Sequence, residues 1–156
     1  MTTWLQEFVK TEKRLKNKRN QKRGQRGQEI AALALERAGF SCVRPIETGW
    51  RVIQRFDPKR KQMVVVKAWP REKVDGDFTA VEPGSGRAVR VEVKAREGKL
   101  LWSDLEAHQV EALDAIVAVG GIGLIAWVCG MECRLYRWPV GSWGPGKSMK
   151  WDQVSK

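Results

Sequence analysis

The stretch from Asp75 to Arg96 constrains the fold most, because its residue types predict a β-hairpin. The first arm covers residues 77–81, and residues 83–86 contain the proline and two glycines that supply the backbone angles of a tight reversal. The second arm, residues 87–95, alternates strictly between apolar and charged side chains, as a strand with one buried face does. The sequence therefore predicts this strand pair at the centre of the fold.

The charged face of the second arm carries Glu92 and Lys94, whose Cα atoms lie about 6–7 Å apart on a strand. Asp77 opens the neighbouring arm, where its carboxylate can converge with that of Glu92. Two carboxylates and an ammonium at adjoining strand ends form a compact site for a hard divalent cation beside a phosphate. A Glu-x-Lys pattern is more often the solvated face of a half-buried sheet, so this strand alone does not distinguish a metal site from an ordinary solvated face.

The composition favours a polyanion as partner. The chain has 156 residues, enough for one domain with a real core, and carries 29 basic against 18 acidic residues, a formal net charge of +11. A small domain this basic usually binds nucleic acid. The sequence lacks an apolar run of membrane-spanning length and an apolar signal core, so we expect a cytoplasmic protein that does not bind membranes.

Basic residues gather in two segments. Residues 10–26 carry nine positive charges and one negative charge, which favours phosphate binding over a solubilising tail. The second segment is the turn between two expected strands, residues 50–56 and 63–69, which form a basic hairpin that protrudes or lies at a sheet edge. The candidate DNA-binding residues are Lys18, Arg19, Lys22, Arg23, Arg26, Lys59, Arg60, Lys61, Arg71 and Lys73.

A first helix is expected at residues 28–38, and Gly39 would cap its end. Gly24 and Gly27 are expected to separate this helix from the basic segment before it. Glu29 would lie in the first turn, where an acid is favourable with the helix dipole whatever its function.

A second helix is expected after residues 103–106, where serine followed three residues later by glutamate forms a capping box. Gln109 falls in the apolar stripe of this helix, and an amide in that place needs a polar partner. Gln109 either makes a simple hydrogen bond in the core or extends its side chain toward Asp77 and Glu92. Further strands are expected at residues 40–46, 122–128 and 133–138, followed by an irregular tail with a short final helix.

The order of helix, strand, basic arms, Asp-bearing strand, Glu-x-Lys strand, helix and strand matches the restriction-endonuclease-like fold, an α/β fold with a central mixed sheet flanked by helices. More narrowly, the chain resembles the RecU-type Holliday junction resolvases of the PD-(D/E)xK nuclease superfamily, and it resembles them as a phage-encoded member would. The resemblance covers residues 24–138. The residues that carry it are Gly27-Gln28-Glu29, Asp77-Phe78, Val91-Glu92-Val93-Lys94, His108-Gln109 with Leu113, and Gly120-Gly121.

The resemblance implies a Mg²⁺-dependent endodeoxyribonuclease, with Mn²⁺ as a substitute, that acts as a homodimer and makes paired nicks in four-way DNA junctions. It implies one nuclease domain, with a basic arm at residues 1–26, a core at 27–138 and a tail at 139–156. Asp75 shares the strand parity of Asp77 and is the competing metal ligand. The implied site residues are Glu29, Asp77 and Glu92 as metal ligands, Lys94 next to the attacking water, and Gln109 as support.

Two other functions remain open at this point. The first keeps the fold and the metal site but cuts other DNA, as a restriction or repair endonuclease does. The second is a non-catalytic nucleic-acid-binding module in which Glu92 and Lys94 form only a solvated face. This module would bind DNA with a steep salt dependence and would not cut it when Mg²⁺ is added.

Overall fold

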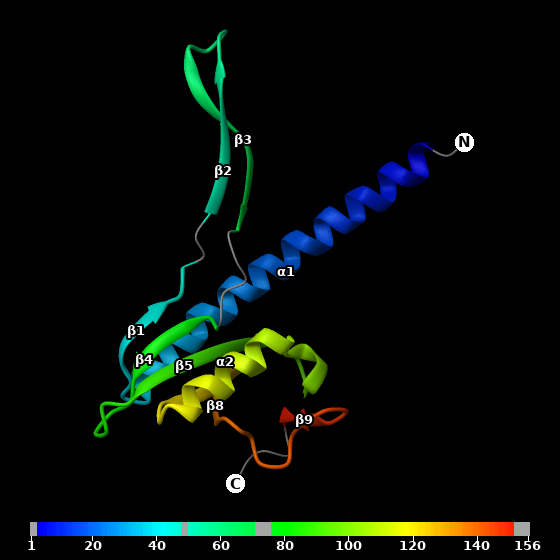
Figure 1. The fold of residues 1–156 in the computed structure, drawn as a ribbon. Helices are drawn as coiled ribbons and strands as arrows, with labels where there is room; N and C mark the ends of the chain where they lie inside the picture. Colours follow the sequence, from blue (N-terminus) through cyan, green and yellow to red (C-terminus); the bar gives the residue numbers. More distant parts are fainter. Residues whose placement is uncertain (1–2, 48–49, 71–75, 152–156) are drawn as a thin grey trace.

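A five-stranded mixed sheet forms the centre of the computed structural model (Figure 1), in the order β1-β4-β5-β7-β8. The structure describes the backbone of residues 3–47, 50–70 and 76–151, and the side chains of 12–47, 56–63 and 76–151. Strands β5 and β7 pair in parallel and the other neighbours are antiparallel. The strands are β1 (Ser41–Pro45), β4 (Phe78–Val81), β5 (Ala88–Ala95), β7 (Ile122–Cys129) and β8 (Glu132–Arg137).

Two helices, α1 (Thr3–Arg37) and α2 (Ala107–Ala118), pack against opposite faces of this sheet. Leu35 of α1 lies in one core with Val91 of β5, on the apolar side of the alternating strand. Leu113 of α2 lies in a second core with Ile125 of β7. Each face of the sheet is thus covered by a helix, and the expected α/β class with a mixed sheet between helices is confirmed.

The helix α1 runs without a break through Gly24 and Gly27, so the expected separation of its two halves was wrong. A Cβ atom built on Gly27 would lie 2.9 Å from the Cβ of Ala95, whereas one on Gly24 would meet nothing within 4 Å. Glycine inside a helix costs about 1 kcal/mol, and the close packing of α1 on β5 outweighs that cost. The amino-terminal half of α1 extends beyond the sheet (Figure 1).

This difference between the two glycines gives a matched pair of substitutions. We expect Gly24→Ala to raise the free energy of unfolding by about 0.5–1 kcal/mol, because alanine is the better helix former and has room there. Gly27→Ala should lower it, because the added methyl group pushes α1 away from β5. Urea unfolding followed by circular dichroism measures both. An equal gain in both variants would contradict the close contact at Gly27.

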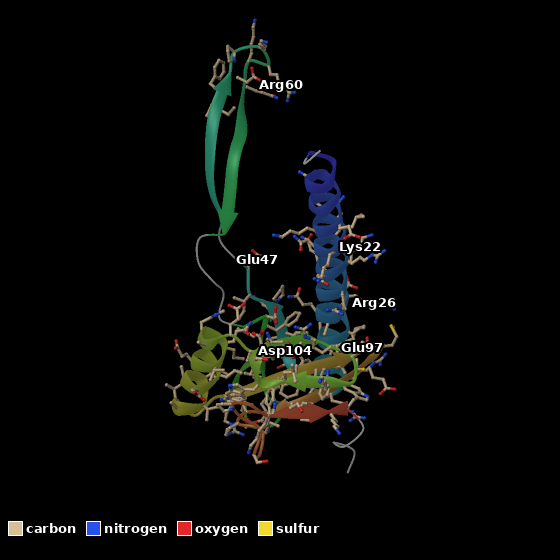
Figure 2. The ribbon with its side chains drawn as sticks, turned by 90° about the vertical axis from the view of Figure 1, so that its right-hand side faces the viewer. Lys22, Arg26, Glu47, Arg60, Glu97 and Asp104 are labelled. Atoms are coloured by element: carbon tan, nitrogen blue, oxygen red, sulfur yellow. The ribbon has the colours of Figure 1, made fainter. Side chains whose placement is uncertain are left out.

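Strands β2 (Trp50–Asp57) and β3 (Gln62–Pro70) form a separate antiparallel hairpin, which confirms the expected strand pair. The hairpin projects from the core on the same side as the free half of α1 (Figures 1 and 2). Its turn is held by Asp57, whose Oδ1 accepts a hydrogen bond of 2.9 Å from the backbone N–H of Lys59. Arg60 lies at the tip (Figure 2). The basic hairpin therefore protrudes and does not form an edge of the central sheet.

The helix α2 begins later than expected, so the capping box at residues 103–106 was wrong. Asp104 instead pairs with Arg96 at 2.7 Å. Glu106 is the N-cap, and its backbone N–H donates a hydrogen bond of 2.9 Å to the Oε1 of Gln109, the third residue of the helix. The side chain of Gln109 thereby satisfies one of the free backbone groups at the start of α2.

Two short strands that the sequence did not predict, β6 (Lys99–Leu101) and β9 (Ser148–Lys150), pair antiparallel, and the short 3-10 helix η1 (Trp102–Asp104) follows β6 directly. Leu100 and Met149 from these strands complete the second core. The short final helix expected near the carboxyl end lies outside the described residues. Among the described residues, none of the helices has the length together with the apolar character that crossing a membrane requires.

Candidate active site

The register of β4 and β5 places Asp77 directly across from Glu92. Phe78 pairs with Val91, so the residue before Phe78 faces the residue after Val91. The backbone N–H of Asp77 donates a hydrogen bond of 2.8 Å to the carbonyl of Val91, which continues the ladder one step beyond β4. Opposed residues of an antiparallel pair project from the same face. The structure thus brings these two predicted site residues together.

The carboxylate of Asp77 is held by two donors. Its Oδ2 accepts a hydrogen bond of 2.7 Å from the backbone N–H of Val93, and its Oδ1 accepts one of 2.6 Å from the Nε2 of Gln28. The first bond satisfies a backbone donor on β5 at a point that β4 does not reach. The second ties α1 to the same carboxylate. Both bonds fix the orientation of Asp77 at the end of the strand pair.

Glu92 is one of the most deeply buried charged residues, with 3% of its surface exposed. Its Oε1 lies 2.9 Å from the Nζ of Lys94 and accepts a hydrogen bond of 2.5 Å from the Nε2 of Gln109. Burial raises the pKa of Glu92 to about 7, against the opposing effect of the Lys94 ammonium, and the charge of Asp77 raises it further. A cation placed between the two carboxylates would relieve both unfavourable effects.

The amide of Gln109 joins the parts of the site. Its Oε1 accepts a hydrogen bond of 2.8 Å from the Nζ of Lys94 and the bond from the backbone of Glu106, while its Nε2 donates to Glu92. Both the oxygen and the nitrogen of this amide therefore have the polar partners that an amide in an apolar stripe requires. Gln109 orients Lys94 and Glu92 together and links the start of α2 to β5.

The structure does not bring Glu29 into this cluster. Glu29 is exposed and lies about 200° around the helix from Gly27, the residue that packs on β5. Gln28, its neighbour, reaches Asp77 instead. In the part of the chain that the structure describes, no three acidic, histidine or cysteine side chains gather closely enough to hold a metal ion. The expected cluster of three carboxylates with Glu29 is thus corrected to a carboxylate pair with an amide beside it.

Gln28 belongs to the Gly27-Gln28-Glu29 motif, but the sequence assigned the role at the site to Glu29 and gave none to Gln28. A helix pattern fixes which residues share a stripe, but the contact at Gly27 decides which stripe faces the strands. That contact depends on the absence of a side chain, which leaves little signal in the apolar pattern. The competing ligand Asp75 lies outside the described residues.

The candidate DNA-binding residues that the structure describes lie on other elements than Asp77 and Glu92. Those on α1 line an exposed helix face above the core, as Lys22 and Arg26 show in Figure 2. Arg23 borders a cleft beside the site together with Lys94 and Arg96. The residues at the tip of the β2–β3 hairpin are all exposed, and they are Lys59, Arg60 and Lys61. Arg71 and Lys73 lie outside the described residues.

The residues of the site fit a hard divalent cation. The oxygen donors that face one another are the carboxylates of Asp77 and Glu92, and Gln28 orients the first of them by donating its Nε2 N–H to Asp77. Mg²⁺ prefers such oxygen donors and keeps several waters, so it needs few protein ligands. The burial of Glu92 beside a second carboxylate is the observation that favours a cation here.

Comparisons with known proteins found distant similarity to solved structures and no sequence relative. The sequence matches no protein-family model, and a search of curated proteins gave no match. The fold is similar to that of Hjc, a Holliday junction resolvase from the archaeal hyperthermophile Archaeoglobus fulgidus, with a TM-score of 0.46 and 20% sequence identity. The similarity covers 72% of this chain and 75% of that chain.

Proposed function

We propose that this protein is a metal-dependent endodeoxyribonuclease that resolves four-way DNA junctions. The observation that carries the proposal is the pair of carboxylates at adjoining strand ends, the half-buried Asp77 and the buried Glu92, with Gln109 joining Glu92 to Lys94. A net charge of +11 and two basic projections supply the means to hold DNA near this pair.

Hydrolysis of a phosphodiester needs an in-line water, neutralised charge at phosphorus and a stabilised leaving oxygen. Mg²⁺ held by Asp77 and Glu92 would supply charge neutralisation and stabilise the leaving oxygen. Lys94 is fixed by Glu92 and Gln109, so its ammonium is already oriented where it can position the water or offset the charge that develops. The hydrogen bonds to Asp77 hold its carboxylate still and reduce the reorganisation required.

The choice of a four-way junction rests on the RecU-type motifs and on symmetry. A four-way junction has two equivalent strands to cut, and a homodimer with paired sites matches that symmetry. The free half of α1 and the β2–β3 hairpin project from one side of the core (Figure 2), where two separated DNA arms can lie against basic side chains.

Incubation of the protein with a synthetic four-way junction, a flap and a linear duplex of matched sequence tests this function. We expect paired, symmetric nicks in the junction with Mg²⁺ and none with EDTA, because the carboxylate pair needs the cation. Equal cutting of the linear duplex would instead indicate a restriction or repair endonuclease of the same fold.

A non-catalytic DNA-binding module is the second candidate, and one observation favours it. Each oxygen of Asp77 and the Oε1 of Glu92 already has a partner within the protein, which is also how a structural network is satisfied. This candidate predicts binding of the junction with steep salt dependence and intact DNA after incubation with Mg²⁺.

A further inference from the structure

The sheet face that carries Glu92 also carries a row of three polar residues on neighbouring strands. Arg44 of β1 is opposite Thr79 of β4, and Thr79 is opposite Arg90 of β5. These strands lie side by side (Figure 1), and residues directly opposed in antiparallel strands project from one face. Adjacent strands are about 4.8 Å apart, so the two arginines flank the threonine hydroxyl with Cα atoms about 10 Å from one another.

This row is the next one on that face after the pair of Asp77 and Glu92. Residues two positions apart on a strand are separated by about 6–7 Å, so Arg90 begins that distance from Glu92, and Thr79 that distance from Asp77. The spacing is comparable to the distance between consecutive phosphates in one strand of DNA. Thr79 and Arg44 are exposed, so the row is open to a ligand.

The two other cations that β5 and its end place on this face, within the described residues, are each paired with a carboxylate. Lys94 is paired with Glu92, and Arg96, which follows β5, is paired with Asp104. The Nε of Arg90 is buried without a hydrogen-bond partner, and among the described residues no carboxylate pairs with Arg90. A guanidinium in such a place is costly unless an anion is bound to it.

The aliphatic part of Arg90 is held in position by close packing. A Cβ atom built on Gly76 would lie 3.2 Å from the Cγ of Arg90, so the stem of the arginine crosses the chain immediately before Asp77. Gly76 has a φ of +96°, a left-handed angle that glycine adopts without strain. Because Gly76 has no side chain, the stem of Arg90 can pass close to the backbone here and extend toward the site.

We propose that Arg44, Thr79 and Arg90 bind a backbone phosphate of DNA next to the phosphodiester held at Asp77 and Glu92. A guanidinium presents paired N–H donors that match phosphate oxygens, and the threonine hydroxyl adds a donor between the two arginines. The contact fixes the position of the strand at the site and reads no sequence. This inference rests on the proposed function for the identity of the ligand as DNA.

The test measures binding of a labelled four-way junction in EDTA at several salt concentrations. We expect Arg44→Gln with Arg90→Gln to weaken binding and to reduce the slope of log K against log salt by about 1, because one phosphate contact contributes about 0.9. The matched control is Lys99→Gln with Lys150→Gln, two exposed cations opposed on β6 and β9, which should leave the slope unchanged.

An equal fall of the slope in both double variants would overturn the site, since it would reflect net charge alone. If the double variant of the row fails to fold, Arg44→Gln alone decides, because Arg44 is exposed: a slope lowered by about 1 supports the site and an unchanged slope overturns it. Cleavage of the junction by the unaltered protein with Mg²⁺ is scored separately. Cutting with an unchanged slope refutes only this site, and a lowered slope without any cutting refutes only the proposed nuclease.

Discussion

Glu92→Gln is expected to reduce cleavage of a four-way junction by at least about 10²–10³-fold while leaving its binding nearly unchanged. The substitution keeps the shape of the side chain and a hydrogen-bond acceptor for Lys94, but it removes the charge that would hold a divalent cation. Binding should persist because most of the basic side chains lie on α1 and on the β2–β3 hairpin. Single-turnover cleavage and binding in EDTA measure the two quantities on the same protein sample.

Two further variants make this result specific. Asp77→Asn should lose cleavage to a similar extent, because Asp77 faces Glu92 across the strand pair. Glu132→Gln, which removes an exposed acid on β8, should cleave as the unaltered protein does. Loss of junction binding in Glu92→Gln or Asp77→Asn, or full cleavage by either, would contradict the assigned roles.

The pKa of Glu92 predicts that the Glu92→Gln variant remains folded. Burial raises this pKa to about 7 in the folded protein, above the ordinary value of 4.5, so the native state prefers the neutral side chain. The stability associated with the neutral form is fully present below pH 4.5 and is lost as the pH rises through 7. Glutamine stays neutral, so the variant should unfold at an equal or higher temperature than the unaltered protein at pH 8 in EDTA.

Trp127→Ala is expected to lower the free energy of unfolding by about 3–5 kcal/mol, a large share of the 5–15 kcal/mol typical of a domain. Trp127 is fully buried, and its ring lies 5.0 Å from that of Trp151 in an edge-on contact. Its Nε1 donates a hydrogen bond of 2.9 Å to the carbonyl of Arg96, at the end of β5. The substitution therefore leaves both a cavity and an unsatisfied backbone acceptor.

Chemical denaturation measures this loss, and Val119→Ala is its control. Val119 is 80% exposed, so its truncation should change the free energy of unfolding by less than about 0.5 kcal/mol. Because Trp127 is opposite Lys94 on the neighbouring strand, Trp127→Ala should also reduce cleavage at temperatures where the protein stays folded. A loss of less than about 1 kcal/mol would show that the second core does not depend on this side chain.

The strands were largely predictable from the sequence because their pattern is local. The alternation from Val89 to Ala95 predicted β5, and the glycines and proline near residue 84 predicted its hairpin with β4. The same register argument placed Asp77 near Glu92. A period of two leaves a strand only two faces, so one buried residue is enough to assign the rest.

The helices were less predictable because their details depend on distant residues. The rotation of α1, which brings Gln28 and not Glu29 to Asp77, follows from the contact between Gly27 and Ala95. The helix α2 starts at Ala107 because Leu105 is extended and Glu106, held by Gln109, is the N-cap. Strands β6 and β9 are too short to show a period, and only their pairing with one another defines them.

The parallel pairing of β5 with β7 has a consequence for synthesis of the chain. Asp77 and Glu92 meet within one hairpin, which can close as soon as it has left the ribosome, whereas a parallel partner must wait for a long crossover. Glu92 becomes buried only when that crossover, which contains Gln109, has been made and β7 has joined the sheet. The basic helix that we propose binds DNA therefore leaves the ribosome well before the chain acquires the arrangement that we propose cuts DNA.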